Sequence, residues 1–112
     1  MRQGAALAML LLAGAFIAPA QGQDGNPLAG RRLAAGICSS CHGRDGIATL
    51  PEAPNLAGQN PAYVEIQLRA SRTGERLHAP MNAVARELTD AQIASVAAWF
   101  TAIQVEVTLP GR

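Results

Sequence analysis

Two cysteines and a histidine are the residues of this chain whose types and spacing could do chemistry. Cys38 and Cys41 are separated by two serines, and His42 follows directly. Cysteines at this spacing can each form a thioether with a vinyl group of a porphyrin, and the histidine can then bind the iron. The 112 residues contain no other cysteine. The pattern predicts one covalently bound haem c, with thioethers at Cys38 and Cys41 and with His42 as an axial ligand.

The same two-cysteine pattern also occurs in redox dithiols, zinc sites and structural disulfides. A zinc ion would need further ligands, and His78 is the one strong ligand type that remains. Adjacent Cys41 and His42 would also have difficulty sharing one tetrahedral ion. A thioredoxin-like dithiol normally lies in a fold with a β-sheet, and this sequence has almost no strand-like stretch. Haem attachment is therefore the favoured interpretation.

Three features carry a resemblance to a known family: the stretch from Cys38 to Gly43, the segment from Pro54 to Gln59, and the lone Met81 ahead of an aromatic-bearing terminal helix. Together they resemble the class I c-type cytochromes, most closely the small bacterial periplasmic type. That type occurs as single-haem proteins and as tandem dihaem proteins. The resemblance covers roughly residues 26–104. It implies an all-α fold of three or more short helices around one haem.

Three further residues are candidates for roles around the cofactor, and the resemblance implies the role of the first. The carbonyl of Pro54 is expected to accept a hydrogen bond from the imidazole of His42, which would orient the ring and raise its basicity. Pro54 could also simply stiffen its loop. Tyr63 is either a core residue or a partner of a haem propionate. Arg76 is a candidate propionate neighbour or an exposed loop arginine.

Met81 is the predicted sixth ligand of the iron, with His78 as its main competitor. Both residues are expected in the loop ahead of the last helix, and Pro80 stiffens the approach. Met81 is far enough along the chain from His42 for the chain to pass around the haem edge. Ligation by histidine and methionine implies a comparatively high reduction potential. Such a potential suits transfer from a dehydrogenase or quinol-oxidising complex to a terminal oxidase.

The first 20 residues have the composition of a secretory signal peptide. Arg2 is followed by a small and apolar run, and Ala18-Pro19-Ala20 offers small residues at a cleavage site. The run is shorter than the ~20 residues that span a bilayer, so we expect cleavage and no stable membrane insertion. We predict export to the periplasm, a flexible lead-in over residues 21–25, and a C-terminal tail over residues 105–112.

Charge gives little support for a nucleic-acid partner. The chain has no lysine, and residues 21–112 carry eight arginines and eight acidic residues, which gives a net charge of zero. No basic patch with interleaved aromatic residues occurs. The near-neutral surface predicts docking to redox partner proteins by contact around an exposed haem edge, with weak dependence on salt.

Capping signals predict where three helices begin. Asn26-Pro27 opens a helix that ends between residues 36 and 38, and Asn60-Pro61 opens a second that ends between residues 71 and 73. The capping box at Thr89 and Gln92 opens a third, which ends at residue 103 or 104. Segments 43–59 and 74–80 are predicted loops.

Two packing predictions accompany these helices. The resemblance implies that Trp99 of the last helix meets the first helix near Gly30 and Ala34, where the glycine permits a close crossing. In the middle helix, a loosely apolar side is predicted to contain Tyr63, Ile66, Leu68 and Ala70.

No residue set in the sequence supports enzyme chemistry, because the carboxylates are scattered and the serines beside Cys41 lack an independent base. If protein ligands occupy both axial positions, the iron cannot easily bind a substrate. The sequence thus predicts a one-electron carrier in a respiratory or dehydrogenase-linked chain. A haem catalyst or gas sensor with an open sixth position is the alternative.

Overall fold

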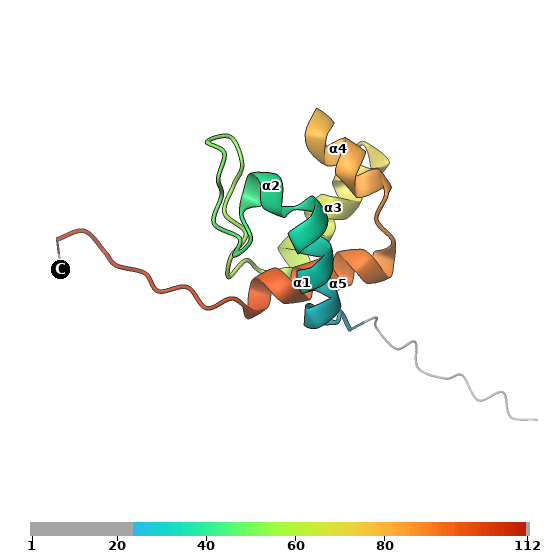
Figure 1. Cartoon of the computed structure of the whole chain (residues 1–112). Helices are drawn as coiled ribbons and strands as arrows, with labels where there is room; N and C mark the ends of the chain where they lie inside the picture. The colour runs from blue at the N-terminus through green and yellow to red at the C-terminus, as the bar shows by residue number, and fades with distance from the viewer. Residues whose placement is uncertain (1–23, 112) are drawn as a thin grey trace, which may run out of the picture.

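The computed structural model describes residues 24–111, and within them the chain forms five helices and no strand (Figure 1). In chain order they are α1 (Pro27–Ile37), α2 (Ser39–His42), α3 (Pro61–Thr73), α4 (Ala79–Arg86) and α5 (Asp90–Ala102). The predicted all-α fold is confirmed. The predicted signal peptide and most of the lead-in lie outside the described residues.

The three predicted helix starts are confirmed by their capping contacts. The side-chain oxygen of Asn26 accepts hydrogen bonds from two backbone amides in the first turn of α1, at 3.0 and 3.1 Å. Asn60 caps α3 in the same way, through the amide of Tyr63 at 3.2 Å. At the start of α5, Thr89 and Gln92 form both hydrogen bonds of a capping box. Each contact satisfies amides that have no partner within their own helix.

The crossing of α1 with α5 depends on the absence of a side chain at Gly30. A β-carbon added there would collide with the backbone carbonyl of Ser95 and would lie 3.0 Å from the β-carbon of Trp99. Figure 1 shows α1 lying across α5 at this point. Ala34, which is 2% exposed, and Trp99 both belong to the core that this crossing covers. The implied contact of Trp99 with α1 near Gly30 is confirmed.

The hydrophobic core is centred on α5, which packs against both α1 and α3. Ile93 and Phe100 are the largest fully buried side chains. The other buried core residues come from α1, α3, α5 and the turn before α5: Ala34, Val64, Leu68, Leu88, Val96 and Ala97. This core lies between α1 and the remaining helices and supports one side of the functional site.

The predicted apolar side of α3 is partly wrong. Helix α3 buries Val64, Leu68 and Ser71, which are spaced four and then three residues apart and so lie on one face of the helix. Tyr63 and Ile66 are 49% and 59% exposed. Two neighbouring stripes of this helix carry apolar residues, and the serine in the buried stripe hides it from a hydropathy pattern.

Two helices were not predicted, and one of them carries Met81. Helix α2 (Ser39–His42) lies between the first predicted helix and the first predicted loop, where no element was assigned, and α4 begins at Ala79, inside the predicted break. Pro80 falls in the first turn of α4, where its missing amide hydrogen costs nothing. Proline therefore marks the start of a helix here and not a loop. Met81 and His78 accordingly lie in the first turn of α4 and at its N-cap.

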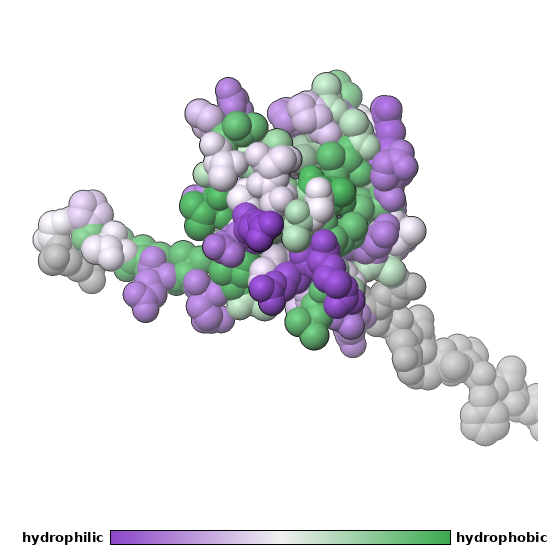
Figure 2. Space-filling view, in the orientation of Figure 1, coloured by the Kyte–Doolittle hydropathy of each residue, from purple (hydrophilic) through white to green (hydrophobic). Residues whose placement is uncertain are grey.

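The chain after α5 is extended and points away from the helices (Figure 1). Its exposed apolar side chains, Val105, Val107 and Leu109, alternate with polar ones (Figure 2). Val105 lies close to Gly58. None of the helices found among residues 24–111 is both long enough and apolar enough to cross a membrane.

Candidate functional site

A cavity of about 530 Å³ lies between α2, α3, α4, α5 and the loop that connects α2 to α3. This volume is in the range of sites for small molecules and cofactors, ~300–1,000 Å³. Every site residue predicted from the sequence lines it. The lining is mostly apolar and includes Leu50, Ala53, Leu56, Val64, Leu68, Pro80, Val84, Leu88, Val96 and Phe100.

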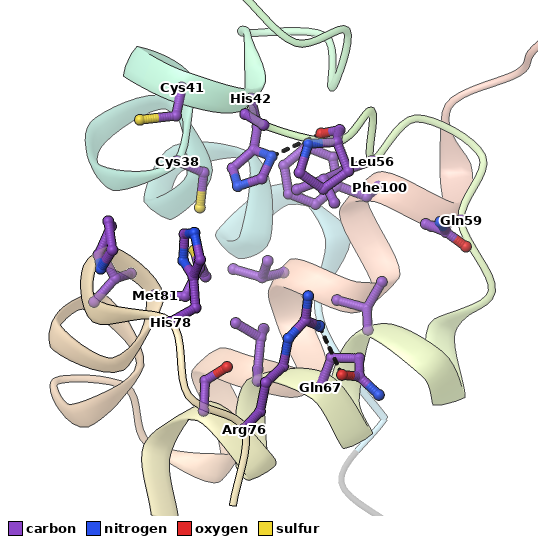
Figure 3. Close-up of a pocket in the computed structure, with 18 of the residues that line it drawn as sticks. Cys38, Cys41, His42, Leu56, Gln59, Gln67, Arg76, His78, Met81 and Phe100 are labelled. Atoms are coloured by element: carbon purple, nitrogen blue, oxygen red, sulfur yellow. Dashed lines mark hydrogen bonds between the residues drawn. The ribbon is translucent and has the colours of Figure 1, made fainter. Parts of the chain in front are cut away.

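Cys38, Cys41 and His42 form one wall of this cavity. Cys38 closes α1, donating its amide to the Ala34 carbonyl at 2.9 Å, and its own carbonyl accepts the amide of His42 at 2.9 Å. This tight turn brings the three side chains together. The two cysteines are not joined to each other in a disulfide. Figure 3 shows Cys38 and His42 extending from this corner toward the cavity.

His42 is buried, with 8% of its surface exposed, and one ring nitrogen has a fixed partner. Its Nδ1 lies 2.8 Å from the carbonyl oxygen of Pro54 (Figure 3). A carbonyl oxygen can only accept, so Nδ1 carries the hydrogen and donates it. In the neutral ring Nε2 is then left with a free lone pair, which is the form of imidazole that binds a metal.

The loop that carries Pro54 is held to the rest of the fold by backbone hydrogen bonds. The amides of Leu56 and Ala57 donate to the carbonyl of Gly46 at 2.7 and 3.1 Å. Farther on, the amide of Gly58 donates to the carbonyl of Phe100 in α5 at 2.8 Å. Gly46 has a φ of 72°, a conformation that L side chains rarely adopt. The backbone directly after Pro54 is therefore tied both to the start of the loop and to α5.

Met81 and His78 enter the cavity from α4, on the side away from α2 (Figure 3). Met81 is partly buried and packs against the hydrophobic core, whereas His78 is exposed. The structure thus brings both predicted ligand candidates to the same cavity. The burial of the methionine favours it, because a thioether packed on the core is already held in place.

Tyr63 and Arg76 lie at the rim of the cavity. Tyr63 is half-exposed, so it is not the core residue that was one of its two expected roles. The Nη1 of Arg76 donates to the side-chain oxygen of Gln67 at 2.6 Å, which holds an exposed loop arginine against α3. Gln67 was missed by the sequence reasoning. A glutamine on a helix surface gives no signal until the following loop folds back over it.

The comparisons with known proteins agree with this arrangement. The family model described as cytochrome c oxidase, cbb3-type, subunit III matches residues 25–100. The chain belongs to the c-type cytochromes. Membership of this family implies a covalently bound haem c.

Two curated relatives and one solved structure show the extent of the similarity. Cytochrome c-554(548) from Halomonas halodenitrificans is 41% identical over 69 residues, which are 59% of this chain and 83% of the relative. A cytochrome c4 from Thiocapsa roseopersicina is 38% identical over 78 residues, 70% of this chain. The cytochrome c4 structure from Acidithiobacillus ferrooxidans has 29% identity and a TM-score of 0.65, and covers 75% of this chain. The chain spans 40% and 53% of these two cytochromes c4.

The residues of the cavity fit the cofactor of this cytochrome family. Two thiols and an imidazole lie on one wall and a thioether on another, and a large apolar lining joins them. A flat apolar ring system would fill such a space and remove its lining from water. Arg76 at the rim supplies the positive charge that a propionate would need.

The other interpretations of the cysteine pair fit less well. Burial raises the pKa of the Cys38 thiol to about 11. A reactive dithiol instead requires a lowered pKa and a thiolate near neutral pH. Within residues 24–111, no three His, Cys, Asp or Glu side chains are grouped so that they could hold a metal ion. A structural zinc site normally takes four such ligands.

Proposed function

We propose that this cytochrome is a periplasmic one-electron carrier that holds a single haem c, with His42 and Met81 as axial ligands. The observation that carries the proposal is the cavity itself, which has Cys38, Cys41 and His42 on one wall and Met81 on another. Four side chains of these types at one apolar cavity match the donor set of a methionine-ligated haem c.

Each of these residues has a definite task in the proposal. The Cys38 and Cys41 thiols would form the two thioethers, and Nε2 of His42 would bind the iron while Nδ1 stays bonded to Pro54. That bond fixes the ring and raises its basicity. When bound, the haem supplies a one-electron couple. With Met81 on the remaining axial side, no position is left for a substrate, which separates a carrier from a catalyst or sensor.

Residues at the cavity rim would set how the cofactor faces its surroundings. We propose Arg76 and Tyr63 as neighbours of the propionates, Arg76 by charge and Tyr63 through its hydroxyl. Two exposed apolar side chains belong to this region: Leu50 lines the cavity, and Leu77 lies in the chain between the lining residues Arg76 and His78. Together with the zero net charge of residues 21–112, they favour docking by contact and not by long-range attraction.

The proposed partners are redox proteins: a dehydrogenase or quinol-oxidising complex as donor and a terminal oxidase as acceptor. The proposed cytochrome domain covers residues 26–104, after removal of residues 1–20 on export. An association rate that falls only weakly between low and high ionic strength is expected for such docking. A steep fall would contradict it.

The test of the proposed function is the visible spectrum of the ferric holoprotein. The weak red-end charge-transfer band of methionine-ligated haem should be present, should vanish in Met81→Ala, and should survive in the matched variant His78→Ala. The reduction potential should drop in Met81→Ala, because a thioether stabilises ferrous iron better than a second imidazole does.

Two outcomes would overturn the assignment. A band that is absent from the unaltered protein, or a spectrum that changes in His78→Ala but not in Met81→Ala, would indicate bis-histidine ligation. Ready binding of carbon monoxide by the unaltered ferrous protein would indicate an open sixth position, and thus a catalyst or sensor.

A further inference from the structure

Asn82, the residue after Met81, uses its side-chain amide to bond three backbone groups of the preceding segment. Its Nδ2 donates to the carbonyl oxygens of Ser71 and Arg76, each at 2.7 Å. Its Oδ1 accepts the backbone amide of His78 at 2.8 Å. One side chain thus joins the end of α3, the following turn and the start of α4.

Two of the three groups that Asn82 bonds are ones that helix ends leave without a partner. Ser71 lies in the last turn of α3, where carbonyls lack an intrahelical amide, and this residue is only 3% exposed. His78 is the N-cap of α4, and its own side chain makes no capping bond. The Asn82 side chain therefore satisfies the amide of the N-cap residue, as the Glu or Gln side chain of a capping box does. It does so from inside the helix.

The chain between these groups would otherwise have little to fix it. The turn from Gly74 to Leu77 is exposed apart from Gly74, and Leu77 is 86% exposed. Helix α4 has eight residues, too few for a stable isolated helix, and it packs mainly on α3. The orientation of the first turn of α4, which carries Met81, thus depends on contacts between α3 and α4.

We propose that Asn82 is a positioning residue that holds Met81 in the cavity by locking the first turn of α4 onto α3. The proposal rests on the proposed function, because the position that Met81 holds is the sixth ligand position. Asn82 acts through the backbone and does not itself touch the cofactor. Its two N–H donors are essential to this role, since the Ser71 and Arg76 carbonyls can only accept.

Competition with added imidazole measures how firmly Met81 is held. Imidazole can bind the ferric sixth position only when the methionine leaves it, so its apparent affinity rises with the fraction of time that Met81 is displaced. The titration is done on holoprotein that also carries His78→Ala, so that no internal imidazole competes. Loss of the red-end band is followed as imidazole is added.

In this background, Asn82→Ala should raise the apparent imidazole affinity roughly tenfold, the change expected from losing hydrogen bonds of ordinary strength. Asn82→Asp has nearly the same volume and keeps an acceptor for the His78 amide but loses both donors, so it should raise the affinity as much. The matched control is Asn26→Ala, which removes two capping bonds at α1, far from α4. It should change the affinity less than about twofold.

If the apparent imidazole affinity of Asn82→Asp or Asn82→Ala stays within about twofold of the parent value, the proposed role of Asn82 is overturned. It is also overturned if Asn26→Ala changes this affinity as much as the Asn82 variants do. The proposed function fails separately, through absence of the red-end band in the parent. One measurement needs no variant: the Asn82 side-chain amide protons should exchange with solvent at least about tenfold more slowly than those of exposed Gln104. Equal exchange rates would also overturn the proposal.

Discussion

The crossing of α1 with α5 and the junction of α3 with α4 are held by different kinds of contact. At the crossing, backbone meets backbone because Gly30 has no side chain, and the fully buried Ile93 and Phe100 of α5 belong to the same core cluster as Ala34 of α1. Dispersion and burial of apolar surface stabilise this crossing, and neither requires a cofactor.

The junction of α3 with α4 relies on polar groups. Asn82 bonds three backbone groups at this junction. Just beyond α4, Arg72 of α3 bonds the Leu88 carbonyl at 2.9 Å and the carboxylate of Asp90, the first residue of α5, at 2.5 Å. Such bonds fix directions but stabilise a fold only modestly. Several apolar side chains of α3 and α4 line the cavity, among them Val64, Leu68, Met81 and Val84. The comparison shows that α1 and α5 pack directly against each other, whereas α3 and α4 also present apolar side chains to the cavity and to the cofactor proposed to fill it.

The largest effect is expected from removing the attachment of the cofactor. Replacing Cys38 and Cys41 with alanine should leave haem extractable by acidified organic solvent, and the protein without haem should be largely unfolded. A domain of this size buries too little apolar surface to be stable when its cavity is not filled. The control replaces Ser39 and Ser40 instead, and should keep its haem. Haem retained by the double cysteine variant would contradict thioether attachment.

A smaller effect is expected at the crossing, where a pair of glycines in α1 provides variant and control. Gly30→Ala should lower the free energy of unfolding by about 1–3 kcal/mol, because the new methyl group collides with the Ser95 carbonyl. In Gly36→Ala the new methyl group has no neighbour within 4 Å, so this variant should raise the free energy of unfolding by about 0.5–1 kcal/mol through helix propensity. Denaturant unfolding of the holoproteins measures both values. Equal effects at the two positions would refute close packing at Gly30.

The smallest effect is expected at Asp90, on the polar side of the comparison. The hydrogen bond and charge of Arg72, with a weaker contribution from Arg69, hold the pKa of this exposed carboxyl below its ordinary value of 3.8. A lowered pKa means that the stabilisation is present above the ordinary value and is lost as the pH falls through the lowered one. Asp90→Asn should therefore lower the Tm slightly at about pH 7 and leave it nearly unchanged at about pH 2.

Thermal unfolding across this pH range, with and without about 1 M salt, checks the prediction. Salt should shrink the difference at neutral pH. A difference of the same size at both pH values would assign it to packing and not to charge.

The sequence was sufficient where one local signal determines the structure. Asn26 and Asn60 before prolines, and the Thr89 capping box, predicted three helix starts because capping depends on neighbours in the chain. The spacing of Cys38, Cys41 and His42 similarly identified one wall of the cavity. These residues are adjacent in sequence, so the fold did not have to bring them together.

The sequence was insufficient where a distant contact determines the structure. Helix α4 has its capping group inside the helix, at Asn82, and that group also bonds the end of α3. No short motif describes such an arrangement. The buried side of α3 was misjudged for a related reason, because packing against the core centred on α5 buries Val64 and leaves its neighbour Tyr63 half-exposed. When the burial or bonding of a side chain depends on a distant part of the fold, it can be predicted only after that part is known.

The Pro54 carbonyl belongs to a loop tied to Gly46 and to α5, and it bonds the ring of His42. The dipole of this carbonyl therefore already points at the ring, whatever the charge beside His42. A fixed dipole does not have to turn when an electron arrives or leaves, whereas free water would rearrange each time. Under the proposed function, this fixed dipole would keep the reorganisation energy of electron exchange low on this side of the cavity. Under the proposed function, the speed of exchange then depends on how closely a partner approaches the rim, and not on motion of the loop.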